Sequence, residues 1–164
     1  PEVVGAVSQI EDHSKLADTI ASHLAVKIQD KQDILDCIQR KCRARDRHDE
    51  KQIASCWWED GTDEHGSIIT AAPDYPKRAN AGHRANFHMT SHNITNHFCE
   101  IDGNTAYCES YVIGGLFWLD GETTTISFGR YLDQLEKRNN EWRILTRRCT
   151  IEMTGDADAS WVYS

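Results

Sequence analysis

Apolar residues in the first part of the chain recur at helical spacing. Across residues 30–47 they fall three and four positions apart, as Ile34, Leu35, Ile38 and Cys42 show. This spacing is typical of an amphipathic helix with one buried face. A second, shorter helix is predicted over residues 49–58, where Ile53 and Trp57 share a face. The dipeptide Asp60-Gly61 is typical of a helix stop.

The pattern changes to strict alternation in the second half of the chain. A stretch rich in turn formers, residues 66–85, precedes this change and predicts a loop with one further helix. Four β segments are predicted, over residues 92–101, 104–119, 124–138 and 141–154. Asp-Gly-Asn, Asp-Gly and Asn-Asn turns separate them and are typical of hairpins. Within the first segment, alternation places Phe98 on the face of His92 and His97 on the opposite face.

Helices followed by an antiparallel meander predict an α+β fold in which a curved sheet wraps N-terminal helices. The length of 164 residues at 18.7 kDa predicts a single domain over residues 1–164, with its core at about 30–153. Residues 1–12 and 155–164 lack a periodic pattern and are interpreted as terminal arms.

Net charge, hydropathy and cysteine spacing argue against nucleic-acid, membrane and zinc binding. The net charge of −8 argues against a nucleic-acid partner. No apolar run approaches the length of a membrane span, and no signal-peptide pattern is seen, so we expect a soluble cytoplasmic protein. None of the six cysteines forms a C-x-x-C pair. This spacing argues against structural zinc, and we expect free buried thiols and no metal.

Asp46 lies near the inner face at the end of the first predicted helix, where a charge needs a partner. One interpretation is that it pairs with Arg43 or Arg47, or caps the following helix. The other is that it points into a cavity, where a cationic or hydrogen-bonding partner stabilises the carboxylate. His92, at the start of the first β segment, is the candidate partner, although a surface or structural role for this histidine remains open.

Several separated motifs together resemble the SnoaL-like group of the nuclear transport factor two-like fold. They are Lys41, Asp46, the Trp57-Trp58-Glu59-Asp60 run, the His88-x-x-x-His92-x-x-Thr95-Asn96 segment and the closing strand over residues 142–147. The likeness is greatest to the branch of hexachlorocyclohexane dehydrochlorinase and scytalone dehydratase. It implies a cone-shaped α+β barrel, with a strongly curved antiparallel sheet around a deep apolar pocket.

The resemblance also implies a site and a reaction. Catalytic roles are expected for His92, Asp46, Lys41 and Arg147, and substrate contacts for Trp57, His88 and Tyr131. His92 would act as a base oriented by Asp46, while Lys41 and Arg147 would stabilise developing negative charge. For both cations a structural alternative remains open: Lys41 snorkelling to solvent, and Arg147 on the outer sheet face.

The implied function is a cofactor-independent lyase that carries out a dehydratase-like or dehydrohalogenase-like elimination on a hydrophobic, cyclic small molecule. The alternatives are an isomerase or cyclase acting on a polyketide or steroid-like substrate, and a non-catalytic binding or assembly module. The resemblance further implies a homo-oligomer, either a trimer or a dimer.

Overall fold

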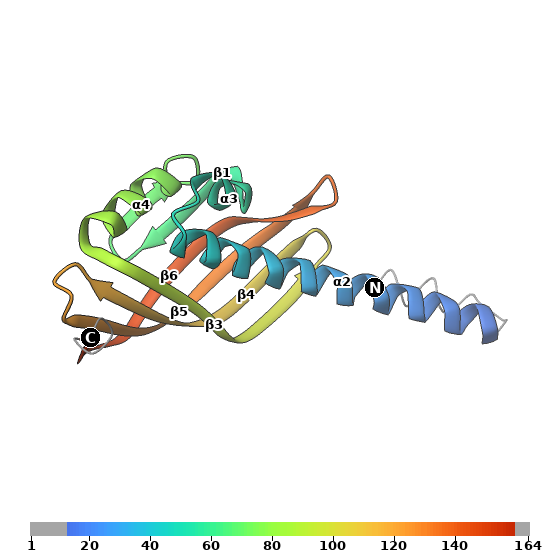
Figure 1. The fold of residues 1–164 in the computed structure, drawn as a ribbon. Coiled ribbons are helices and arrows are strands. Elements are labelled where there is room, and N and C mark those ends of the chain that lie inside the picture. The colour runs from blue at the N-terminus through green and yellow to red at the C-terminus, as the bar shows by residue number, and fades with distance from the viewer. Residues whose placement is uncertain (1–12, 160–164) are drawn as a thin grey trace. The chain divides into compact units, whose positions relative to one another are not determined.

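The computed structural model describes residues 13–159. The elements follow one another in the order α2 (His13–Asp46), α3 (Glu50–Ser55), β1 (Trp57–His65), β2 (Ile68–Ala71), α4 (Tyr75–Asn86), β3 (Phe87–Asp102), β4 (Thr105–Trp118), β5 (Thr123–Arg138) and β6 (Glu141–Asp158) (Figure 1). None of the helices in this part of the chain has an apolar stretch long enough to cross a bilayer.

The chain divides into two compact units, Pro1–Asp33 and Ile34–Ser164. The described part of the first unit is helical throughout and belongs to α2. The second unit contains the last part of α2, the whole sheet and every side chain predicted to form the site. One domain over residues 1–164 therefore stays a prediction.

The inner face of α2 changes character along the second unit. Ile34, Cys37 and Ile38 are fully buried and share one hydrophobic core with the sheet residues Leu135 and Ile144. One turn further on, the same face carries the buried cations Lys41 and Arg45. The amphipathic helix predicted over residues 30–47 is confirmed. Beyond the apolar core, the buried face of this helix carries charged side chains in place of apolar ones.

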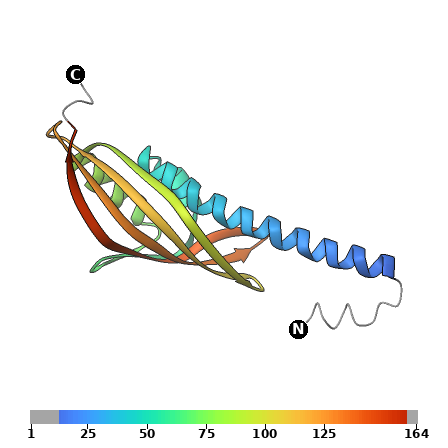
Figure 2. The same ribbon diagram turned by 90° about the horizontal axis from the view of Figure 1, so that it is seen from below.

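The sheet has six strands in the order β2-β1-β6-β5-β4-β3. Strands β3 to β6 form the predicted antiparallel meander, whereas β1 pairs parallel with β6. The sheet is therefore mixed, because the parallel strand β1 is added to the predicted antiparallel meander. Within the second unit the strands curl without closing, with β2 and β3 at the two edges of the sheet (Figures 1 and 2). The curved α+β fold is confirmed.

Strand β1 occupies residues expected to end a helix and turn. The second helix stops at Ser55, and Trp57 begins the strand. Gly61 explains why a strand can form here: a Cβ atom at this position would lie 2.6 Å from the Leu145 backbone oxygen. The glycine that is typical of a helix stop instead permits close approach of β1 to β6.

Strands β3 and β6 extend beyond their predicted limits. β6 continues to Asp158, so residues 155–158 are strand and not a terminal arm. The arms predicted over residues 1–12 and 160–164 lie outside the described residues. In β3 a one-residue bulge lies between Ile94 and His97, because these residues pair with Val112 and Ser110. A bulge reverses the alternation of faces. Phe98 consequently points outward, 63% exposed, and the predicted facing of His97 is wrong.

Candidate functional site

A cavity of about 390 Å³ lies within the second unit, where the end of α2 meets the sheet and α4. Its walls come from α2, β1, β2, α4, β3 and β5, with Ile68 at the start of β2 opposite His65 of β1. The ionisable groups on these walls include Lys41, Arg45, Asp63, His83 and His92. Tyr75, Ala79 and Tyr131 supply apolar surface. The cavity therefore combines an apolar lining with a concentration of charge.

Asp46 and His92 meet at the edge of this cavity. The Asp46 Oδ1 atom lies 2.6 Å from His92 Nδ1, and Oδ2 accepts the His92 backbone N–H at 2.9 Å. The Thr90 hydroxyl donates a further hydrogen bond to Oδ1 at 2.9 Å. The N-cap of α3 is Asp49, so Asp46 does not fill that role. Of the two interpretations of Asp46, the structure shows the one with a hydrogen-bonding partner on the sheet.

The surroundings of Asp46 and His92 lower the pKa of both groups, which leaves the histidine neutral and the carboxyl group ionised near pH 7. Burial lowers the pKa of His92 below its ordinary value, although its hydrogen bond with Asp46 acts in the opposite direction. Burial raises the pKa of Asp46, but the hydrogen bonds from His92 and Thr90 outweigh this and bring it below the usual range. With Nδ1 engaged by Asp46, Nε2 is the basic atom of the imidazole.

A second histidine backs the first. The His83 ring, from α4, stacks on His92 with centroids 5.7 Å apart and planes 6° from parallel. Phe87 packs edge-on against the His83 ring. Burial lowers the pKa of His83 to about 3. His83 is therefore an uncharged wall that holds the plane of the His92 ring.

Lys41 extends into the cavity from the inner face of α2. The residue is buried, and its Nζ atom lies 5.1 Å from the centroids of both the Tyr75 and Tyr131 rings. Cation–π contacts of this kind hold the ammonium in place. No carboxylate of the described residues forms an ion pair with it. The snorkelling alternative is wrong, and the charge of Lys41 is available to a bound molecule.

Arg147 does not line the cavity. Its guanidinium is fully buried and forms a two-pronged ion pair with Asp133, at 2.6 and 2.7 Å. The same group stacks on the Tyr131 ring at 3.9 Å. Arg147 therefore packs behind Tyr131, a residue of the cavity wall. Its charge is neutralised by Asp133.

Among the three residues expected to contact substrate, the structure places only Tyr131 on the cavity wall. Trp57 is buried in the core behind Tyr75, with ring centroids 5.5 Å apart. His88 is exposed on β3 and packs beside Phe117. Neither His88 nor Trp57 lines the cavity, and Tyr75, which does, packs against Trp57.

The residues that sequence reasoning missed come from β1 and α4. Asp63 and His65 lie on alternate positions of β1 and line the cavity, as does His83 of α4. Asp63 is 1% exposed, and neither carboxylate oxygen has a hydrogen-bond partner among the described residues. The Asp-x-His alternation is the signal that could have found them, once this segment is read as a strand.

The matching residues are extensive enough to establish a family. The model of the SnoaL-like domain matches residues 26–148, about three quarters of the chain. The chain belongs to the SnoaL-like family. A family model that starts before Ile34 and ends within β6 spans nearly all the structure that shapes the cavity.

Solved structures of similar fold agree with this membership. A putative scytalone dehydratase from Novosphingobium aromaticivorans has a TM-score of 0.75 and 19% identity, covering 82% of this chain and 91% of that one. A type 2 hexachlorocyclohexane dehydrochlorinase has a TM-score of 0.74 and 19% identity, covering 80% and 90%. A Mycobacterium tuberculosis protein of unknown function has a TM-score of 0.70 and 26% identity, covering 79% and 75%. The first two likenesses, at this identity, concern the fold alone.

One short segment of this SnoaL-like chain has a different relative. Over 39 residues it is 72% identical to the Lon protease of Azorhizobium caulinodans, a match that covers 24% of this chain and 5% of the protease. The chain thus spans a small fraction of the length of the curated relatives it matches. A match of this extent identifies a shared segment and not a shared activity.

Proposed function

We propose that this SnoaL-like protein is a lyase that removes water from a hydroxylated, largely hydrophobic cyclic molecule, with His92 as the general base. The observation that carries the proposal is the 2.6 Å contact between Asp46 Oδ1 and His92 Nδ1 at the edge of a partly apolar cavity. A histidine held in one tautomer by a carboxylate is suited to proton abstraction.

The proposed step begins at the free nitrogen of His92. Nε2 takes a proton from a carbon of the substrate, and the electrons of that C–H bond form the new C=C bond as the neighbouring C–O bond breaks. Asp46 stabilises the imidazolium. Lys41 is the one cavity-lining cation held between two tyrosine rings, and it stabilises the charge developing on the leaving oxygen. That oxygen takes a proton from the His92 imidazolium and departs as water, which returns the imidazole to its neutral form.

Asp63 supports a hydroxyl over a halide on the substrate. A buried carboxylate without a donor is costly, and a ligand that donates a hydrogen bond removes that cost. Both Asp63 oxygens lack such a donor in the described part of the chain, and the residue lines the cavity. A substrate hydroxyl supplies a donor, whereas a chlorine atom does not. Among the eliminations considered, loss of water is therefore favoured.

The size of the cavity limits the substrate. At about 390 Å³ it lies near the lower end of the range of small-molecule sites, roughly 300–1,000 Å³. Tyr75 and Tyr131 offer aromatic faces on which a ring can pack. We therefore expect a substrate of one or two rings that carries at least one hydroxyl group.

The proposal is tested with a panel of hydroxylated and chlorinated one-ring and two-ring compounds. Each compound is incubated with the wild-type protein and with His92→Ala in deuterated water, and products are followed by mass spectrometry. Asn93→Ala, an exposed neighbour outside the cavity, is the matched control. We expect dehydrated products and deuterium exchange only with wild type and the control. Binding without exchange would favour a non-catalytic module, and a shifted double bond without loss of water would favour an isomerase.

We also infer that the protein self-associates through the sheet. Large apolar side chains are exposed on four neighbouring strands: Phe98, Tyr107, Phe128, Ile151 and Met153. Large apolar side chains exposed on several strands favour burial against a protein partner, and a second copy of this chain is such a partner. Sedimentation equilibrium would show a dimer or trimer for wild type and a lower mass for Phe98→Lys. A wild-type monomer at micromolar concentration would contradict the inference.

A further inference from the structure

A second cluster of chemically active side chains lies on β3 and β4, apart from the cavity. In the antiparallel ladder Cys99 pairs directly with Cys108, and His97 pairs with Ser110. Alternation along each strand places the four side chains together on one face. This face is the inner one, because Cys99 and Cys108 belong to the same hydrophobic core as Cys37 of α2.

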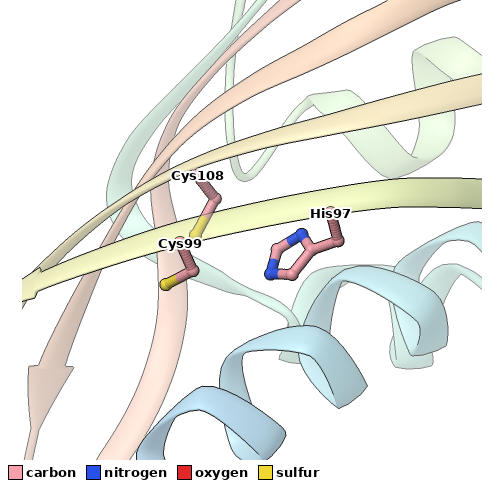
Figure 3. Close-up of side chains that lie close together, drawn as sticks. All are labelled: His97, Cys99 and Cys108. Carbon is pink, nitrogen blue, oxygen red and sulfur yellow. The ribbon is translucent and has the colours of Figure 1, made fainter.

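The potential ligand atoms in this cluster converge. One ring nitrogen of His97 and the two sulfur atoms of Cys99 and Cys108 all lie within 4.8 Å of one another (Figure 3). Both cysteines are only 6% exposed. One metal ion bound to all three atoms at ordinary metal–N or metal–S bond lengths of about 2.0–2.3 Å would hold them no more than about 4.6 Å apart, so uptake requires only a small adjustment of the side chains. The backbone ladder therefore holds three ligands near a common point.

The histidine of this cluster has one nitrogen occupied and one without a partner. Its Nδ1 atom lies 2.8 Å from the Ser110 hydroxyl oxygen, and Ser110 is fully buried. Its Nε2 atom is buried and has no hydrogen-bond partner among the described residues. Buried polar atoms are rarely left unsatisfied, and a metal-binding histidine usually has its other nitrogen fixed by a hydrogen bond. The arrangement is that of a ligand held ready.

We propose that His97, Cys99 and Cys108 bind a soft, thiophilic metal ion, and that this ion is Cu⁺ in three-fold coordination. Two sulfurs and one imidazole nitrogen are the donor set that soft ions prefer. Structural Zn²⁺ almost always takes four ligands, and the cluster of described residues offers three. On uptake each thiol releases its proton to solvent, and the imidazole binds the ion through a nitrogen lone pair.

The site is independent of the proposed lyase reaction. None of its three ligands lines the cavity. β3 is an edge strand of the sheet, so the cluster lies next to the sheet margin and not at its centre. The site is also compatible with the acidic chain, because cation binding is favoured by the net charge of −8.

The test is an anaerobic titration of the fully reduced protein with Cu⁺ in competition with the chromogenic chelator bicinchoninate. We expect one equivalent bound per chain. His97→Gln, Cys99→Ser and Cys108→Ser should each weaken binding by at least about 100-fold, in line with the loss of one ligand. Cys149→Ser, which removes a buried thiol outside the cluster, should bind as wild type does. X-ray absorption should show two sulfur neighbours and one nitrogen neighbour.

Circular dichroism would reveal any variant that fails to fold. A second measurement, which uses the wild-type protein alone, then tests the proposal. In the wild-type protein, bound Cu⁺ should protect Cys99 and Cys108 from alkylation while leaving the labelling of the other cysteines unchanged. Ser110→Ala, which keeps all three ligands, should weaken binding by about tenfold because it frees the His97 ring. Three results would each overturn the proposal: no binding, protection of other cysteines, or a Cys99–Cys108 disulfide in place of bound metal. Tighter binding of Zn²⁺ than of Cu⁺ would overturn the assignment of the ion.

Discussion

Two histidines of β3, five residues apart, differ in the group that contacts one of their ring nitrogens. His92 and His97 both engage Nδ1 in a short contact, with Asp46 at 2.6 Å and with Ser110 at 2.8 Å. The partner of His92 is a carboxylate, which stabilises a protonated ring, whereas the partner of His97 is a neutral hydroxyl. His92 lies on a cavity wall, while the Nε2 atom of His97 is buried near two sulfurs. The partner of one nitrogen thus decides whether the other suits proton transfer or coordination.

The largest expected effect separates the two histidines by activity. His92→Ala should lower kcat/KM by about 10³-fold, or about 4 kcal/mol, because it removes the base from the cavity. His97→Gln should leave kcat/KM unchanged, since that ring does not line the cavity. Steady-state kinetics on the substrate identified by the panel would measure both. Equal losses in the two variants would end the distinction between the clusters.

Metal-dependent stability separates the same histidines in the opposite sense. With free Cu⁺ at one hundred times its Kd, the folded wild-type protein should gain about 2.7 kcal/mol, provided the unfolded chain does not bind the ion. His92→Ala should show the same gain, and His97→Gln should lose most of it. Urea unfolding with and without the ion provides the measurement. A gain that persists in His97→Gln would place the ion elsewhere.

Replacing the carboxylate tests the charged partner of His92. Asp46→Asn keeps a hydrogen-bond acceptor at Nδ1 but removes the charge that stabilises the imidazolium, so kcat/KM should fall by about 30-fold. Asp46 raises the pKa of His92, although burial lowers it more. The variant should therefore have a still lower His92 pKa, and the acid limb of its pH–rate profile should move to lower pH. An acid limb shifted to higher pH would contradict the proposed arrangement.

The smallest expected effect concerns acid stability. Burial lowers the pKa of His83 in the folded state to about 3, below the ordinary value of 6.5. The unfolded chain therefore binds a proton more readily, and stability is lost as pH falls from about 6.5 towards 3. By pH 5 the loss attributable to His83 should be about 1–2 kcal/mol. His83→Phe should flatten this part of the urea stability profile, and an unchanged slope would show that other groups dominate.

Part of the site was within reach of the sequence. Asp46 and Lys41 fall on the inner side of an amphipathic helix, and the period of that helix is a local property of the chain. The motif resemblance then identifies His92 as the partner of Asp46. The sequence predicts correctly that Arg147 lies on a strand, but its pairing with Asp133 depends on the register between β5 and β6. Register between strands is not expressed in the periodicity of either one.

The metal-binding cluster shows a different limit. A search for C-x-x-C pairs misses Cys99 and Cys108, because the ligands are brought together by cross-strand pairing and not by a short loop. The bulge between Ile94 and His97 adds to the difficulty. One extra residue turns His97 to the inner face, so simple alternation predicts the wrong side.

By itself the sequence determined the segments that repeat at short range: the amphipathic helix, the three hairpins of the meander and the mixed α+β character. Only the tertiary structure decided that β1 pairs parallel with β6, which brings Asp63 and His65 into the cavity. Only it decided that Cys99 opposes Cys108. The physical reason is that local periodicity records which face of an element is buried, whereas the partner of that face is chosen by packing between distant segments.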